Sequence, residues 1–218
     1  MAQLQLLKSG KNFQVYTDGT QKLIKIGGRL SYPAFGKKKR NEDEQSGKVR
    51  ENWGGVIMLP KATHKEAYDE LVAICEEIRS NAMNEKTNKR GVMIEPQNFC
   101  YKDGDTKKDE AMHGHWLVTF SDSLRQPTIR RKNGEVMMDV GEIDSLFYGG
   151  CWGNVLLRPW YFNGKAKSDP KTYPKRISSG FTGAQFVKDD EPFGAGRIDD
   201  TDAWGSVDGD DTEDDDGL

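Results

Sequence analysis

Only one segment of the sequence has the periodicity of an amphipathic helix, and this limits the folds that the chain can adopt. Apolar residues recur at spacings of three and four across residues 64–80: Tyr68, Leu71, Val72, Cys75 and Ile78. Thr63, with Glu66 three residues later, matches a capping box at the start of this helix. A parallel α/β fold needs a helix after most of its strands, so we expect a mainly β fold.

Short apolar segments bounded by glycine, proline or charged residues indicate the strands. They are residues 21–30, 53–59, 115–120, 128–131, 135–138, 148–162 and 181–187. Asn133-Gly134 is a strong hairpin signal because both positions tolerate positive φ. Gly149, Gly150 and Gly153 are expected to bend the strand that contains them. These features favour a bent antiparallel barrel with long loops, similar to the OB-fold, whose face and loops commonly hold oligonucleotides.

Charge is distributed unevenly along the chain. Residues 1–188 hold 31 Lys and Arg against 22 Asp and Glu, whereas residues 189–218 hold 13 acids and one base, Arg197. The C-terminal segment lacks the apolar residues that a core requires. We therefore expect a domain of residues 1–194 followed by a disordered acidic tail of residues 195–218. A basic body joined to an acidic tail is typical of nucleic-acid or partner binding.

Several classes of protein are disfavoured by the sequence. No apolar run approaches the roughly 20 residues that span a bilayer, and the N-terminus lacks a basic segment followed by an apolar one. The three cysteines, Cys75, Cys100 and Cys151, are odd in number and widely spaced, as expected of free thiols in a reducing cytoplasm. No phosphate-binding or nucleophile-elbow motif is present.

The strand at residues 151–162 has two different faces. Cys151, Val155, Leu157 and Tyr161 alternate on one face, which is expected to join the core. The other face carries Trp152, Arg158 and Trp160. Rings stack on bases at about 1–3 kcal/mol per base, and cations follow the phosphates, so this face is a candidate for binding a single strand. The alternative is a core that takes tryptophan from both faces.

Two basic segments strengthen this interpretation. A loop is expected between residues 31 and 50, and it contains two aromatic residues followed by four cations: Tyr32, Phe35, Lys37, Lys38, Lys39 and Arg40. A second cluster, Arg130, Arg131 and Lys132, lies at the expected hairpin, and Trp53 is a further candidate ring. Such charge would hold a nucleic-acid backbone without reading its sequence. The alternative is that both segments are ordinary solvated loops.

Metal and enzymatic sites are poorly supported. His113 and His115 could be combined with Cys100 and Cys151, but the cysteines lack Cys-x-x-Cys spacing, so no metal and no cofactor are expected. The acidic residues Asp139, Glu142 and Asp144 could belong to a metal-dependent nuclease. That activity remains an alternative to binding, as does an acidic DNA-mimic module in which the tail is the functional part.

Several motifs resemble a known family. They are GRLSYP at residues 28–33, LPK at 59–61, YGGCW at 148–152, and the segment 180–194. In this order they are similar to phage-encoded single-stranded DNA-binding proteins with an OB-fold, over residues 25–194. The resemblance implies a non-enzymatic protein that coats single-stranded DNA during phage DNA replication, recombination or repair in the cytoplasm of the bacterial host.

The resemblance also implies a role for the tail. Acidic tails of related proteins contact replication partners and compete with DNA, so phage or host replication and recombination proteins are expected partners here. The residues assigned to this contact are Trp204, Asp214, Asp215, Asp216 and Leu218. Several related tails end in an aromatic residue, whereas this one ends in leucine. A homodimer is left open, and no membrane contact is expected.

Overall fold

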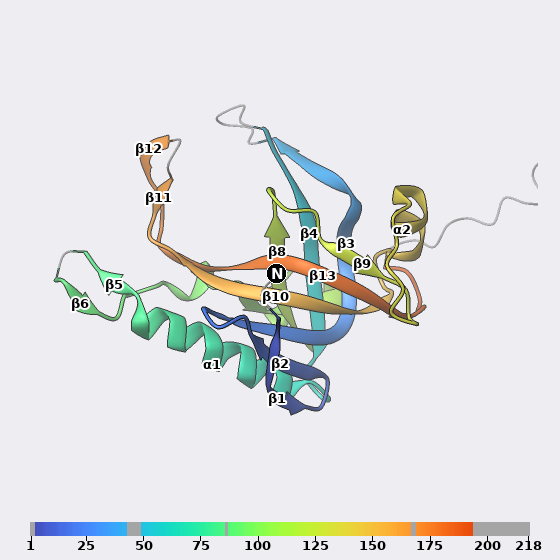
Figure 1. Cartoon of the computed structure of the whole chain (residues 1–218), viewed down its shortest axis with the longest axis horizontal. Helices are drawn as coiled ribbons and strands as arrows, with labels where there is room; N and C mark the ends of the chain where they lie inside the picture. Colours follow the sequence, from blue (N-terminus) through green and yellow to red (C-terminus); the bar gives the residue numbers. More distant parts are fainter. Residues whose placement is uncertain (1–2, 43–48, 86, 167–168, 194–218) are drawn as a thin grey trace, which may run out of the picture.

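The computed structural model describes residues 3–42, 49–85, 87–166 and 169–193. Within these residues, nine strands form one sheet with the path β7-β8-β4-β3-β10-β13-β9 (Figure 1). Strand β2 pairs with β3, and β1 pairs with β2. The strands are β1 (Gln5–Gly10), β2 (Phe13–Thr17), β3 (Lys22–Glu42), β4 (Val49–Pro60), β7 (Tyr101–Asp103), β8 (His115–Asp122), β9 (Thr128–Arg130), β10 (Trp152–Phe162) and β13 (Arg176–Lys188).

Small hairpins and helices complete the described chain. The hairpins are β5 (Met83–Asn84) with β6 (Lys89–Arg90), and β11 (Lys165–Ala166) with β12 (Asp169–Thr172). The helices are α1 (Lys65–Asn81), α2 (Val140–Leu146) and the 3-10 turns η1 (Pro96–Asn98), η2 (Gly104–Thr106) and η3 (Glu110–Met112). Within the described residues, no helix is long and apolar enough to cross a membrane.

The sheet is strongly bent and almost entirely antiparallel. The exception is the parallel pairing of β9 with β13. Over the described ranges no continuous ladder joins the two ends of the strand path, although an isolated bridge connects Phe99 with Ile177 of β13. The prediction of a mainly β, OB-like fold is therefore confirmed, with a sheet that is not closed.

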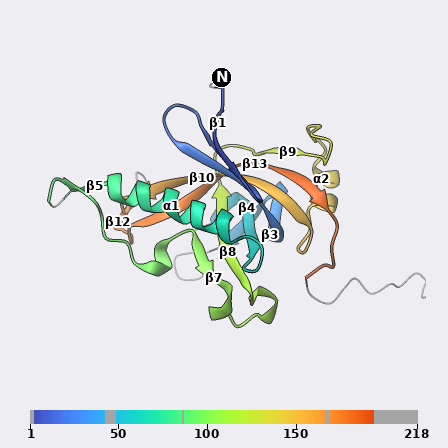
Figure 2. The ribbon, with the colours of Figure 1, turned by 90° about the horizontal axis from the view of Figure 1, so that it is seen from below.

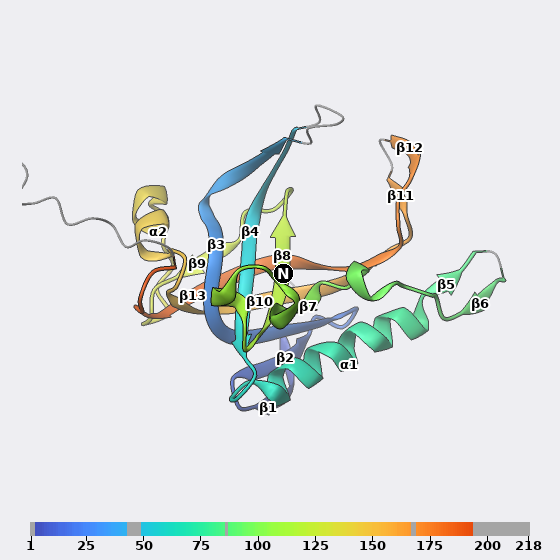
Figure 3. The same ribbon diagram turned by 180° about the vertical axis from the view of Figure 1, so that it is seen from behind.

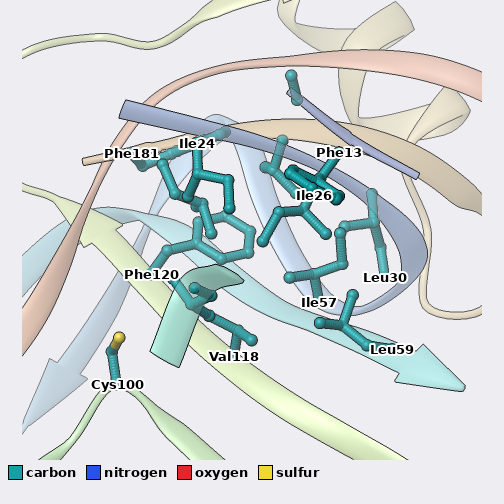
Figure 4. Packing of buried hydrophobic residues seen from close by; sticks show 14 of the residues in the cluster. Phe13, Ile24, Ile26, Leu30, Ile57, Leu59, Cys100, Val118, Phe120 and Phe181 are labelled. Carbon is teal, nitrogen blue, oxygen red and sulfur yellow. The ribbon is translucent and has the colours of Figure 1, made fainter. Parts of the chain in front are cut away.

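The core lies inside the bend and is covered at one end by α1 (Figures 1 and 2). Strands β3, β4, β8 and β13 contribute alternate apolar residues to it, among them Ile24, Ile57, Phe120 and Phe181, which converge in Figure 4. Helix α1 contributes Ala67, Leu71, Ile74 and Cys75 from one face. The helix is where its periodicity predicts it, because those positions repeat at the helical spacing.

The predicted capping box of α1 is wrong. His64 occupies the N-cap without a side-chain capping bond. The Thr63 hydroxyl is instead 2.8 Å from Nδ1 of His64, and a carboxylate oxygen of Glu66 accepts from the backbone N–H of Lys11 at 3.4 Å. The two residues of the motif thus make other contacts.

The basic loop predicted at residues 31–50 is also wrong in its described part. Strand β3 continues to Glu42, β4 begins at Val49, and the two pair as a long arm with Arg40 opposite Glu51. Backbone hydrogen bonds satisfy a solvated hairpin whatever its side-chain polarity, so a charged sequence can form a strand here. The arm rises from the sheet on the same side as the β11-β12 hairpin (Figures 1 and 3).

The hairpin predicted at Asn133-Gly134 is present as a tight turn. The N–H of Arg131 donates to the carbonyl of Glu135 at 2.9 Å, and Gly134 has a positive φ of 88°. Of the two residues, only Gly134 has its backbone in the left-handed region of positive φ. The segment after the turn makes a single bridge between Val136 and Arg130, so a second strand is not formed at residues 135–138.

Candidate nucleic-acid interface

An open groove lies between the β3-β4 arm and the β10-β13 pair. One wall is formed by residues 50–52 of β4, and the next by residues 121–124 at the end of β8. The floor is formed by Arg158 and Trp160 of β10 and by Arg176 and Gly180 of β13. Segments distant in the sequence therefore place three arginines and a tryptophan around one hollow.

The alternation predicted for β10 is confirmed. Val155 and Leu157 are buried, whereas Arg158 is partly exposed and Trp160 is 40% exposed. Arg158 lies opposite Gly180 in the β10-β13 ladder. A Cβ at position 180 would be 3.2 Å from Nε of Arg158, so glycine gives the guanidinium room to lie across the strand.

Two further aromatic contacts shape the floor of the groove. The guanidinium of Arg176 lies 4.3 Å from the ring centroid of Phe162, and the Phe162 ring meets Trp160 edge to face at 6.1 Å. Burial, followed by repulsion from Arg50, lowers the pKa of Arg176. Arginine remains charged at neutral pH. Two neighbouring guanidinium groups therefore concentrate positive charge where an anion would relieve their repulsion.

The cations of the arm pair with rings and carbonyls. The ammonium of Lys38 lies 4.4 Å from the Trp53 ring centroid and donates to the carbonyl of Ser123 at 2.9 Å. The ammonium of Lys39 lies 5.6 Å from the ring of Tyr32, which is 63% exposed. Lys37 and Arg40 are also exposed on the arm, with Arg40 lying 3.8 Å from Glu42.

Phe35 is not on this surface. It is 1% exposed, and its ring centroid lies 4.7 Å from that of Phe181 and 5.0 Å from that of Phe147. A ring enclosed in this way cannot meet a base while the core is intact. We therefore remove Phe35 from the candidate interface.

The second basic cluster does not line the groove. It lies at the α2 end of the molecule (Figure 1), where Arg131 pairs with Glu142 and also lies 3.7 Å from Glu135. Arg130 donates to the carbonyl of Gly134 at 2.8 Å, and the backbone carbonyl of Lys132 accepts from Gln185 at 3.2 Å. Binding by this cluster stays a prediction for a separate surface.

Trp152 lies at the opposite end of β10 from Trp160. Its Nε1 donates to a carboxylate oxygen of Asp190 at 2.6 Å, and this bond lowers the pKa of that carboxyl group. Arg29 donates to the carbonyl of Glu191 at 2.7 Å and lies 4.4 Å from the ring centroid of Phe193. Residues 190–193 are thus fixed beside Trp152 and Arg29.

The carboxylates considered for catalysis have separate structural contacts. Asp139 caps α2 by accepting from the N–H of Glu142 at 2.7 Å, and Asp144 accepts from the N–H of Gly36 at 3.0 Å. Among the described residues, no group of three or more potential metal ligands is found. Cys75, Cys100 and Cys151 are buried free thiols, and burial raises the pKa of Cys151 to about 11.

Sequence reasoning missed three residues of the groove: Arg50, Leu124 and Arg176. They come from different strands or loops, and no local pattern indicates that they meet. Residues 194–218, which include Trp204, Asp214, Asp215, Asp216 and Leu218, lie outside the described residues.

A family model described as Enterobacter phage Enc34, ssDNA-binding protein, matches residues 21–217. The chain belongs to this family. The resemblance to phage single-stranded DNA-binding proteins is therefore confirmed, and so is the prediction of a protein that is not an enzyme.

Solved structures of the Enc34 family agree with this assignment. The single-stranded DNA-binding protein from bacteriophage Enc34 has a TM-score of 0.71 and 29% identity, covering 92% of this chain and 98% of its own. Its complex with ssDNA gives a TM-score of 0.72 and 27% identity, covering 89% of this chain and 100% of that one.

Two more distant proteins are also similar. The single-stranded DNA-binding protein gp2.5 of bacteriophage T7 shares the fold, with a TM-score of 0.54 and 15% identity over 87% of this chain and 100% of its own. A protein named p50 from Acyrthosiphon pisum secondary endosymbiont phage 1 is 21% identical over 173 residues, covering 78% of this chain and 85% of its own.

Proposed function

We propose that this protein binds single-stranded DNA in the groove between the β3-β4 arm and the β10-β13 pair. The main support is that Arg50, Arg158, Arg176 and Trp160 line the same hollow. The solved complex of the Enc34 relative with ssDNA supports the same ligand. We further propose that the protein acts in phage DNA replication, recombination or repair in the cytoplasm of the bacterial host.

The chemistry of the groove suits a flexible strand. A ring exposed at the floor can stack on any base, because every base has a π-face. Guanidinium groups can donate to phosphate oxygens in pairs, which fixes the backbone without reading its sequence. The arm carries four further cations, Lys37, Lys38, Lys39 and Arg40. Lys38 lies near the Trp53 ring and reaches the groove lining at the carbonyl of Ser123, whereas Lys39 lies near the ring of Tyr32.

Titration with fluorescently labelled oligo-dT and with a duplex of the same length, each followed by anisotropy, tests the proposal. We expect tighter binding of oligo-dT, because stacking needs bases that are free of a partner strand. Replacing Arg158 and Arg176 together by glutamine should weaken oligo-dT binding. Lys8→Gln combined with Lys65→Gln is the matched control, because these lysines pair with Glu70 and Asp69 of α1 and lie outside the groove lining. Equal or tighter binding of the duplex would contradict the proposal.

For the tail, we propose contact with phage or host replication and recombination proteins through Trp204, Asp214, Asp215, Asp216 and Leu218. The support is the charge of the segment, since residues 189–218 hold 13 acids and one base. The boundary at residue 194 belongs to this proposal, and a homodimer remains compatible with it. Trp204→Ala and Leu218→Ala should each weaken capture of such partners from infected cells, and unchanged capture by both variants would argue against it.

A further inference from the structure

A leucine lies at the rim of the cationic groove. Leu124 is 90% exposed and lines the groove together with Arg158, Arg176 and Trp160. A single exposed leucine would need no explanation on a free surface. The turn that carries this leucine, however, is held in place from three strands.

Asp122 builds that turn. One of its carboxylate oxygens accepts from the backbone N–H groups of Leu124 at 2.8 Å and of Arg125 at 2.9 Å. Its other oxygen lies 3.6 Å from Nη2 of Arg158 on β10, and the Asp122 side chain is only 12% exposed. A mostly buried carboxylate beside a groove that binds anions lowers the affinity for anions. Its presence is explained by its structural role in the turn.

The β3-β4 arm supplies the third support. Lys38 donates from its ammonium to the carbonyl of Ser123 at 2.9 Å, between Asp122 and Leu124. The turn is thus fixed by β8, β10 and β3, and its backbone is ordered before any ligand arrives. Preorganised contacts cost less ordering entropy on binding.

We propose that Leu124 packs against the face of a nucleobase that also contacts the Trp160 ring, and that Asp122 is the positioning residue for this contact. The inference rests on the proposed function and names a base subsite within it. An aliphatic side chain offers no donor to a phosphate, whereas a base face is apolar.

The first test compares two ligands that differ in bases and keep the same phosphates. Anisotropy titrations use oligo-dT and an oligonucleotide of equal length made of abasic sites. Leu124→Ser should weaken oligo-dT binding by about three- to ten-fold and leave abasic binding unchanged. Met138→Ser is the matched control, because Met138 is 84% exposed and lies outside the groove lining. An equal loss on both ligands, or an equal loss in the control, would overturn the base contact.

The second test separates position from charge at residue 122. Asp122→Asn keeps a side-chain oxygen for the N–H groups of Leu124 and Arg125, so the preference for oligo-dT over the abasic ligand should be retained. Asp122→Ala removes the acceptor, so this preference should fall to that of Leu124→Ser, and the double variant should lose nothing further. Circular dichroism checks that each variant is folded. If the alanine variant is unfolded, Asp122→Val replaces it, since its side chain suits a strand and has no acceptor for these N–H groups.

The outcomes distinguish the inference from the function on which it rests. A wild-type protein that fails to bind oligo-dT contradicts the proposed function itself. A wild-type protein that binds oligo-dT, with Leu124→Ser behaving like wild type on both ligands, contradicts only the base subsite. An Asp122→Ala protein with an unchanged preference contradicts only the positioning role.

Discussion

At the scale of single residues, Trp160 and Trp152 have opposite environments although they share a strand and a face. Trp160 lines the groove and is 40% exposed. The indole N–H of Trp152 is already bound to Asp190 at 2.6 Å. An exposed ring such as Trp160 can accept a base, whereas Trp152 is partly buried and its N–H is held by Asp190.

We therefore predict that Trp160 dominates the optical response to DNA. Trp160→Ala should weaken oligo-dT binding by about 1–3 kcal/mol, the usual contribution of one stacked base. Oligo-dT should quench the fluorescence of the wild type and of Trp152→Phe strongly, and that of Trp160→Phe much less. Strong quenching that persists in Trp160→Phe and disappears in Trp152→Phe would show that the other end of β10 is the stacking site.

Phe35 gives a second prediction at the same scale. Because its ring is enclosed by Phe147 and Phe181, Phe35→Ala should leave a cavity and lower the free energy of unfolding by about 3–5 kcal/mol. Thermal unfolding followed by circular dichroism measures this loss. The folded variant should keep most of its oligo-dT affinity at low temperature. If Phe35→Ala kept the stability of the wild type but bound oligo-dT more weakly, Phe35 would belong to the interface.

At the scale of elements, the β3-β4 arm is a strand pair that carries a run of like charge. Such a run is tolerated because the arm is solvated and because two of its lysines lie near the rings of Trp53 and Tyr32. The backbone ladder fixes where those charges lie, which a flexible loop would not do. The arm thus presents four cations at fixed positions, with Lys38 in contact with the groove lining at Ser123.

This arrangement predicts a measurable salt dependence. Replacing Lys37, Lys38, Lys39 and Arg40 by glutamine should weaken oligo-dT binding and flatten the plot of log K against log salt. Each lost phosphate contact should reduce the slope by about 0.7. Titrations at several NaCl concentrations give the slope. Glutamine at Lys8, Lys22, Lys65 and Arg79, four cations that pair with acids of α1, serves as the control for net charge. An equal change of slope in that control would contradict a specific role for the arm.

At the scale of the whole molecule, the described body and the C-terminal segment have opposite charge. The body binds an anion in our proposal, and the chain carries a polyanion of its own. Covalent attachment gives such a segment a high effective concentration near the body. We therefore predict that the segment competes with DNA in the complete chain.

Removing residues 199–218 should consequently tighten oligo-dT binding at low salt. The gain should shrink as NaCl rises, because screening weakens the competition that the deletion abolishes. Anisotropy titrations of the full chain and of the truncated chain provide the comparison. A chain in which all ten acids of this segment are replaced by their amides is the matched control for charge. Equal affinities of the full and truncated chains at low salt would exclude this competition.

Local patterns in the sequence predicted the parts of the fold that depend on neighbours in the chain. The helical spacing of Leu71 and Cys75 locates α1, and the alternation of Val155 and Arg158 assigns the two faces of β10. The same rules failed for the arm, because charge was interpreted as a sign of a loop. They also assigned Phe35 to the surface, because the local sequence does not indicate whether a single aromatic residue in a basic segment is buried.

By itself the sequence determined a mainly β chain with one long helix, a basic body, an acidic end and a resemblance to phage single-stranded DNA-binding proteins. Only the tertiary structure decided which cations and rings meet. Arg50, Arg158 and Arg176 are far apart in the chain, and strand pairing brings them to one hollow while leaving Arg131 with Glu142 elsewhere. The physical reason is that helix and strand periodicity are local, whereas the register and bend of a sheet depend on contacts between distant segments.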